Sequence, residues 1–121
     1  MPITGPDFIS LQVRDLERSA AFYESLGLER APFSPPGAVV FGTGPAAFAV
    51  RTPAPGTDLD GTAQPGHGVA LWMHATEVRR LHDDLVGADA TITTAPFDGP
   101  FGLTFTFADP DGYLVTLHDR A

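Results

Sequence analysis

The sequence contains no cysteine and no lysine. The absence of cysteine and the small number of basic residues each exclude a class of function. Without cysteine there can be no disulfide, no thiolate nucleophile and no cysteine metal ligand. All seven basic residues are arginines, against 15 acidic residues, and the formal net charge is −8. Phosphate binding requires a basic patch, so we expect no nucleic-acid partner.

Long apolar runs are also missing. No run is long enough to span a bilayer, and the first residues, MPITGPDF, lack the basic start and apolar core of a signal peptide. We therefore expect no membrane partner and a cytoplasmic location. The length of 121 residues, 43% of them hydrophobic, predicts a single globular domain over 1–121.

What the sequence does contain is a repeat with an offset of sixty residues. Apolar residues alternate along 8–13, as in a half-buried strand. Asp15 can cap the helix that follows, and Gly27 can end it. Sixty residues later, 68–73 alternates in the same way and Gly87 takes the place of Gly27. Between residue 73 and Gly87, the residues Val78, Leu81 and Leu85 are expected to share one face of a second helix.

Short strands separated by Gly or Pro follow each predicted helix. They are expected at 29–33, 38–42 and 47–51 in the first half, and at 90–94, 103–108 and 113–118 in the second. The fold class is therefore α+β, with two βαβββ modules at about 6–52 and 67–121. A hinge rich in Pro, Gly and Asp joins them at about 53–66.

The paired modules, the helix segment VRDLERSAAFYESLGL and the hairpin FADPDGYLVTL together resemble the vicinal oxygen chelate superfamily. This superfamily includes glyoxalase I, extradiol dioxygenases, fosfomycin-resistance enzymes and bleomycin-resistance proteins. The resemblance implies a cup-shaped mixed sheet with the helices on its outer face. One fold of this kind hosts many functions, so the resemblance alone does not give the activity.

Metal-dependent members of the family are expected to carry a His on the first strand of each module and a Glu on the last strand. Carried onto this chain, those places are Phe8, Gly68 and Thr116, and the first-module counterpart of Thr116 is near Val50. None of them is a useful ligand for a divalent ion. We therefore expect no metal and no other cofactor.

Of the four histidines, only His118 is expected on the cup face, two residues beyond Thr116. His67 lies one residue from the Gly68 place, on the opposite face of a strand. His74 falls where the strand gives way to the helix, and His82 falls within the helix. One histidine does not make a chelate.

The vacated ligand places mark the inward face of each strand, and that face is apolar and aromatic. Phe97 and Phe101 join it from a Pro- and Gly-rich loop at 95–102. Small residues at 68 and 70 leave room for a ligand, as in many small-molecule pockets. The predicted lining is Phe8, Ser10, Gln12, Phe48, Val50, Gly68, Ala70, Trp72, Phe97, Phe101, Thr116 and His118.

No carboxylate, lysine or cysteine is expected inside the cup, so binding is favoured over chemistry. The resemblance then implies the antibiotic-binding branch, whose members sequester a drug as homodimers. A planar aromatic or polycyclic ligand suits the apolar lining, whereas the negative charge would suit a cationic drug such as bleomycin. The alternative is a lyase, isomerase or oxygenase that acts through His118 or an unorthodox metal site. Side chains that simply fill the cup are a further alternative.

The metal content of the purified protein directly tests the interpretation that Phe8, Gly68 and Thr116 stand at ligand places without binding a metal. We expect the purified protein to retain no stoichiometric Zn, Fe, Mn or Ni, because these places offer no ligand set. Elemental analysis after dialysis measures this, and a chelator should leave the melting temperature unchanged. One equivalent of metal retained through dialysis would contradict the expectation.

Overall fold

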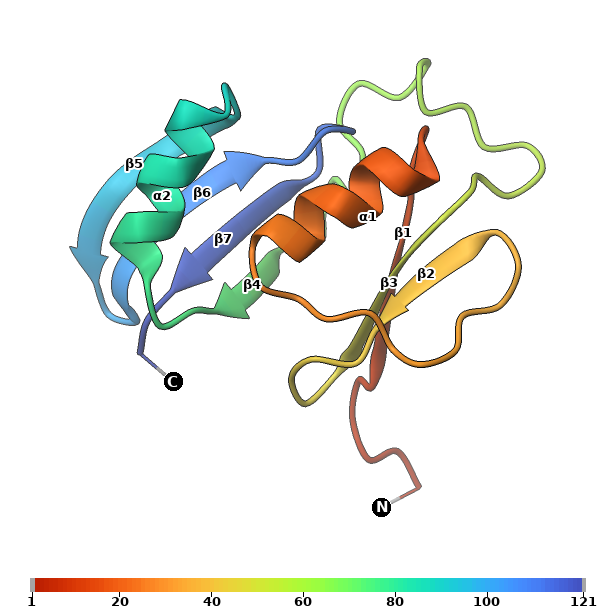
Figure 1. Ribbon diagram of the computed structural model, residues 1–121, viewed down its shortest axis with the longest axis horizontal. Helices are drawn as coiled ribbons and strands as arrows, with labels where there is room; N and C mark the ends of the chain where they lie inside the picture. Colours follow the sequence, from red (N-terminus) through yellow and green to blue (C-terminus); the bar gives the residue numbers. More distant parts are fainter. Residues whose placement is uncertain (1, 121) are drawn as a thin grey trace. The chain divides into compact units, whose positions relative to one another are not determined.

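The computed structural model describes residues 2–120, which form two helices and seven strands (Figure 1). The chain divides into two compact units, the first ending at Gly61 and the second beginning at Thr62. This boundary lies inside the predicted hinge, and each unit contains one helix and one sheet. The α+β class and the division into two modules are confirmed, while the single domain stays a prediction.

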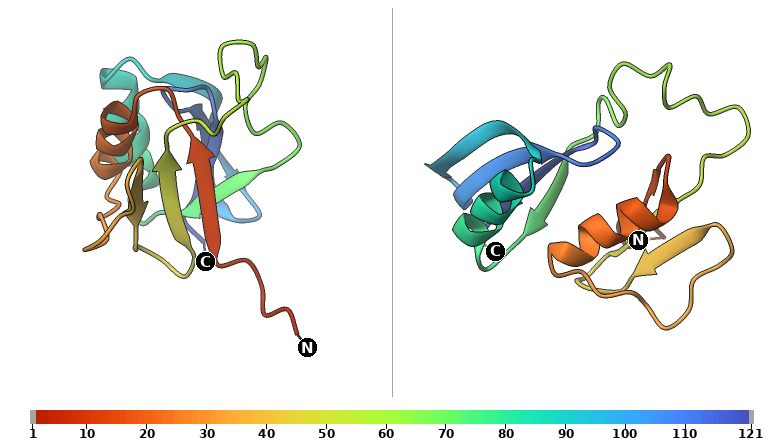
Figure 2. Two further views of the ribbon diagram at one scale, coloured as in Figure 1. Left: turned by 90° about the vertical axis from the view of Figure 1, so that its right-hand side faces the viewer. Right: turned by 45° about the horizontal axis from the view of Figure 1, so that its top comes forward.

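The first unit is a three-stranded sheet with one helix. Its elements are β1 (Phe8–Gln12), α1 (Leu16–Ser25), β2 (Ala38–Phe41) and β3 (Ala47–Arg51). The strand order is β1-β3-β2, with β1 parallel and β2 antiparallel to β3 (Figure 2). The last strand of the unit is therefore its central one, and it fixes the places of the other two.

Helix α1 begins and ends where the sequence predicts. The Asp15 carboxylate accepts a hydrogen bond from the Arg18 N–H at 3.1 Å, which caps the first turn. Gly27 ends the helix with a φ of +105°, a conformation that glycine adopts without strain. The helix buries Tyr23, whose ring lies 4.9 Å from the ring of Phe48 on β3. The core of the unit thus lies between α1 and one face of the sheet.

The strand predicted at 29–33 does not form. This segment makes a single bridge between Arg30 and Phe41. Pro32 has no N–H to donate to a ladder, and two further prolines follow at 35 and 36. The first unit is therefore βαββ within the described residues, with one bridge where the second strand of the motif was expected.

The second unit has the full βαβββ order. Its elements are β4 (Leu71–His74), α2 (Val78–Gly87), β5 (Thr91–Gly99), β6 (Gly102–Ala108) and β7 (Leu114–His118). The sheet order is β4-β7-β6-β5, with β4 parallel to β7 and the other pairs antiparallel. As in the first unit, the first strand pairs with the last.

Two predicted boundaries in the second unit are wrong. Strand β4 starts at Leu71 rather than at residue 68, because Gly66 and Gly68 have φ values of +75° and +89° and form turns. Strand β5 continues to Gly99, so the predicted loop at 95–102 is mostly strand and hairpin turn.

Helix α2 covers one face of the second sheet. Val78, Leu81 and Leu85 are buried, as predicted from their spacing, and the His82 ring lies 5.2 Å from that of Phe105 on β6. Gly87 is the last residue of the helix and has no positive φ, and the residue in the left-handed conformation just beyond the helix is Asp89, with a φ of +61°. Neither helix of the described chain is long and apolar enough to cross a membrane.

Most of the segment predicted as a hinge is bound to the first unit. The Gln12 side-chain oxygen accepts hydrogen bonds from the Ala54 N–H at 2.6 Å and the Thr57 hydroxyl at 2.8 Å. Arg14 binds Asp60 at 2.7 Å, and the Leu59 side chain is buried. Residues 53–61 are therefore an ordered part of the first unit.

The turn between β6 and β7 is built around the buried carboxylate of Asp109. One oxygen of this carboxylate accepts hydrogen bonds from the N–H groups of Asp111 and Tyr113, both at 2.9 Å. Gly112 completes the turn with a φ of +96°. These bonds set where β7 begins, and β7 carries two of the predicted ligand-binding residues, Thr116 and His118.

Replacement of Asp109 by Ala should lower the free energy of unfolding by about 2 kcal/mol, because one buried and one partly buried N–H group lose a charged acceptor. Urea denaturation measures the change. Asp98→Ala is the matched control, since it removes the same charge from an exposed position on β5. Equal stability of the Asp109→Ala variant and the control would contradict this role for the turn.

Candidate functional site

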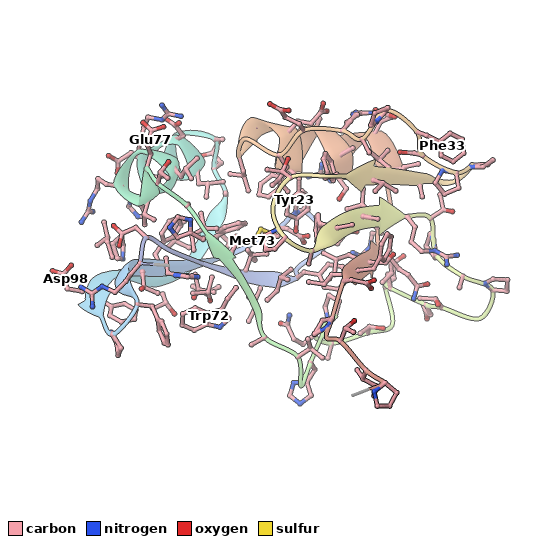
Figure 3. The ribbon with its side chains drawn as sticks, turned by 90° about the horizontal axis from the view of Figure 1, so that it is seen from below. Tyr23, Phe33, Trp72, Met73, Glu77 and Asp98 are labelled. Carbon is pink, nitrogen blue, oxygen red and sulfur yellow. The ribbon has the colours of Figure 1, made fainter. Side chains whose placement is uncertain are left out.

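The second sheet has one face against α2 and one face directed away from it. Residues paired across neighbouring strands share a face. Trp72 pairs with Thr116 and His74 with His118, whereas Leu71 and Met73 belong to the helix side. Figure 3 shows Trp72 and Met73 on opposite sides of β4. We call the side that carries Trp72 the open face, and it consists of Trp72, His74, Phe97, Thr104, Thr106, Thr116 and His118.

Three rings gather on this open face. The Trp72 ring centroid lies 5.6 Å from that of Phe101 and 5.7 Å from that of His118, and the Phe101 and His118 centroids are 6.0 Å apart. Trp72 is 47% exposed and Phe101 53% exposed. This aromatic cluster, defined as Trp72, Phe101 and His118, therefore offers ring surface that the unit does not bury itself. Trp72 lies on the face opposite to Leu71 and Met73, as the strand alternation predicts, while its direction into a cup stays a prediction.

A second histidine, which the sequence analysis placed at a strand end, lies beside the cluster. The His74 and His118 ring centroids are 5.8 Å apart. The Nδ1 atom of His118 lies 3.0 Å from the Arg120 carbonyl oxygen, and the Nε2 atom of His74 lies 3.3 Å from the Asp119 carbonyl oxygen. A carbonyl only accepts, so these nitrogens carry the protons. The strand alternation that places Trp72 on this face also places His74 there, two residues later.

Thr116 and Phe97 complete the predicted residues on this face. The Thr116 hydroxyl forms a 2.7 Å hydrogen bond with that of Thr106, so these two groups satisfy each other. Phe97 is exposed on β5, in line with Thr104 and His118, and its ring lies against Gly99. Phe97 thus belongs to the open face, although from a strand rather than from the predicted loop.

The first unit contains a pocket on the sheet face opposite α1. Its volume is about 300 Å³. Phe8 and Ser10 from β1 and Ala49 and Arg51 from β3 contribute to one wall, and Pro35 and Pro36 to another. Phe8 and Ser10 are therefore where the sequence analysis expected them, on a face that could receive a ligand.

Two residues predicted for this face lie on the other side. Phe48 and Val50 are buried between β3 and α1, because Ile9 pairs with Phe48 and Leu11 with Val50 on the helix side of the sheet. The predicted alignment of β3 was wrong by one residue. A register shift of one residue turns every side chain of a strand to the opposite face of the sheet.

The correct register brings in a residue that the sequence analysis missed. Gln12 pairs with Arg51 in the first unit, as Trp72 pairs with Thr116 in the second. At the offset of sixty, Gln12 matches Trp72, so the structural counterpart of Thr116 is Arg51 rather than Val50. The signal was present in the sequence, since a basic residue ending an apolar strand is unusual in a buried face.

Gly68, Ala70 and Gln12 do not act as predicted. Gly68 and Ala70 precede β4, and Gly68 lies in a turn, so the strand alternation does not assign them to an inward face. Gln12 lies on the predicted face of β1, but its side-chain oxygen is occupied by Ala54 and Thr57. Its role in this structure is to hold the segment after β3.

The three places at which the family resemblance implies metal ligands do not form a ligand set in the described chain. Phe8 lies in the pocket, Gly68 in a turn, and the Thr116 hydroxyl is bonded to Thr106. Within residues 2–120, no group of three or more His, Cys, Asp or Glu side chains is arranged to hold a metal ion. Metal independence stays a prediction, to be decided by elemental analysis.

Comparison with known families gives one match over nearly the whole chain. Residues 5–117 match the family model described as the Glyoxalase/Bleomycin resistance protein/Dioxygenase superfamily. A search of curated protein sequences finds no significant relative.

Solved structures with the same fold include proteins of different activities. A glyoxalase-related enzyme from Fulvimarina pelagi is 26% identical, with a TM-score of 0.75 over 98% of this chain and 89% of its own. TnmS3, an antibiotic binding protein from Streptomyces sp. CB03234, is 21% identical, with a TM-score of 0.75 over 100% of this chain and 99% of its own. The fosfomycin resistance protein FosX from Listeria monocytogenes is 18% identical, with a TM-score of 0.70 over 98% and 94%.

Proposed function

Because this chain belongs to the glyoxalase/bleomycin resistance protein/dioxygenase superfamily, we propose that it is a metal-independent small-molecule binding protein of the cytoplasm. Its ligand is a planar aromatic or polycyclic antibiotic, and it confers resistance by sequestering this ligand in an aromatic-lined cleft of a homodimer. The antibiotic-binding protein from Streptomyces sp. CB03234, which shares the fold, supports this choice among the activities of the family.

The observation that carries the proposal is the exposure of the aromatic cluster. Trp72 is the only tryptophan of the chain, and nearly half of its surface is exposed on a face that α2 does not cover. A flat ligand that stacks on Trp72 and Phe101 would bury this surface, which is favourable for apolar area and for ring stacking. The buried core of this unit, which includes Phe105 and Leu117, lies on the helix side of the sheet and does not contain Trp72.

An enzyme that acts through His118 is the second candidate function. The Arg120 carbonyl oxygen holds the proton on Nδ1, so in the neutral ring the other nitrogen, Nε2, keeps its lone pair. No residue of the described chain makes a hydrogen bond to Nε2. A histidine in this state is able to accept a proton from a bound ligand. The two functions differ in whether the ligand is recovered unchanged.

Trp72→Ala tests the stacking role. A panel of polycyclic quinone antibiotics, with bleomycin as the cationic comparator, should contain a compound that quenches Trp72 fluorescence in the wild-type protein. Such a compound should also stabilise the fold, by about 2.7 kcal/mol at a hundredfold excess over Kd. Calorimetric titration of the Trp72→Ala variant should then give a loss of about 1 to 3 kcal/mol in binding free energy.

Phe33→Ala is the matched control, since Phe33 is an exposed aromatic residue between α1 and β2, outside the open face (Figure 3). It should bind as the wild type does. Unfolding of the Trp72→Ala variant, together with no ligand that shifts the wild-type melt, would count against the binding function. Mass spectrometry of recovered ligand separates the candidates: a mass change that disappears in His118→Gln favours the enzyme.

Homodimer formation is expected from the edge strands, each of which has only one neighbouring strand within its own unit. Each sheet has two edge strands, and the β5 edge is broken by two register shifts, whereas β4 and β1 are regular. Regular edges with exposed apolar residues, such as Ile9 on β1 and Trp72 on β4, are surfaces that a second chain can cover. Light scattering at micromolar concentration should give twice the mass of the chain, and a clean monomer would contradict the shared cleft.

A further inference from the structure

The pocket of the first unit differs from the aromatic cluster in carrying one positive charge. Arg51 lies at the end of β3 and lines the pocket together with Phe8 and Ser10. The Nε–H of Arg51 donates to the Thr52 carbonyl oxygen at 2.9 Å, which orients the group. In residues 2–120 no carboxylate lies within salt-bridge distance of Arg51, so both terminal NH₂ groups are available.

Three of the six other arginines form ion pairs with carboxylates of the described chain. Arg14 pairs with Asp60, Arg30 with Glu17 and Glu24, and Arg80 with Glu77 and Asp84. Arg51 is exposed and has no such partner in the described chain, and it differs from the remaining arginines in lining the pocket. It is the group that would meet a ligand.

The proline wall of the pocket is apolar and is held in place by backbone hydrogen bonds. Pro35, Pro36 and Gly37 form a turn, in which the Ala38 N–H donates to the Pro35 carbonyl oxygen at 3.2 Å. The Thr52 N–H donates to the Gly37 carbonyl oxygen at 2.9 Å, which fixes the turn to the end of β3. A wall that is already ordered saves the entropy cost of closing over a ligand.

We infer that Arg51 binds the acidic group of a planar aromatic acid in this pocket. A guanidinium group matches a carboxylate through two parallel hydrogen bonds, and the ring of the acid would lie between Phe8 and the proline wall. The Ser10 hydroxyl, which makes no hydrogen bond to another residue of the described chain, lies on the same wall and is able to donate to the ligand. A volume of about 300 Å³ is at the lower end of small-molecule pockets, which favours a small aromatic acid.

This inference does not rest on the proposed drug-binding function. All the residues involved belong to the first unit, and Trp72 takes no part. It also reverses the expectation that the negative net charge of the chain makes a cationic ligand the better fit, because the charge nearest to the bound molecule would be positive.

Benzoate is the probe, and benzamide is its uncharged counterpart of nearly the same shape. In an NMR titration of the full-length ¹⁵N-labelled protein, benzoate should cause saturable shifts at the amides of Phe8, Ala38 and Thr52 below about 10 mM. Benzamide should bind about tenfold or more weakly, because it cannot form the charge-assisted pair. This comparison needs no variant of the protein.

Arg51→Met should weaken benzoate binding by about tenfold or more, and Arg51→Lys should retain part of the affinity. Arg79→Met is the matched control, since it removes the same charge from an exposed position on α2 and should bind as the wild type does. Trp72→Ala should also bind benzoate normally. Absence of saturable shifts at the pocket, equal binding of benzoate and benzamide, or equal losses in the Arg51→Met and Arg79→Met variants would each overturn the inference.

Discussion

The pairing of the first strand of each unit with its last strand is the constraint on which both candidate sites depend. β1 lies parallel to β3 and β4 parallel to β7, so the last strand is enclosed between neighbours on both edges. The register of these two ladders decides which side chains face the helix and which do not. Trp72 and Arg51 both owe their exposure to it, because a shift of one residue would bury them and expose Met73 and Val50.

Local sequence signals predicted much of this arrangement. The cap at Asp15, the stop at Gly27 and the buried face of α2 follow from side-chain chemistry within one or two turns, and they agree with the structure. The direction of Trp72 was also predictable, because the strand alternation around it is short and regular. These features depend on neighbours in sequence, which a single chain reveals.

Some of the errors concern relations between segments that are distant in sequence, and others concern the backbone conformation of single residues. Phe48 and Val50 were assigned to the wrong face because nothing local fixes the register of β3 against β1. Gly68 was read as a strand residue, whereas its positive φ makes it part of a turn. The offset of sixty between the halves holds for the first strands but not for the helix ends, where Asp89 rather than Gly87 takes the role of Gly27.

The two candidate sites share one property, which is that neither is needed for the core of its unit. In the first unit α1 packs on Phe48 and Val50, and in the second α2 packs on the side of Phe105, so the cores lie on the helix sides. Substitutions at Trp72, Phe101, Ser10 or Arg51 therefore remove little buried area. Point mutations at these positions can therefore change which ligand the protein binds while the fold stays stable. Selection on such mutations would act on ligand recognition and not on folding.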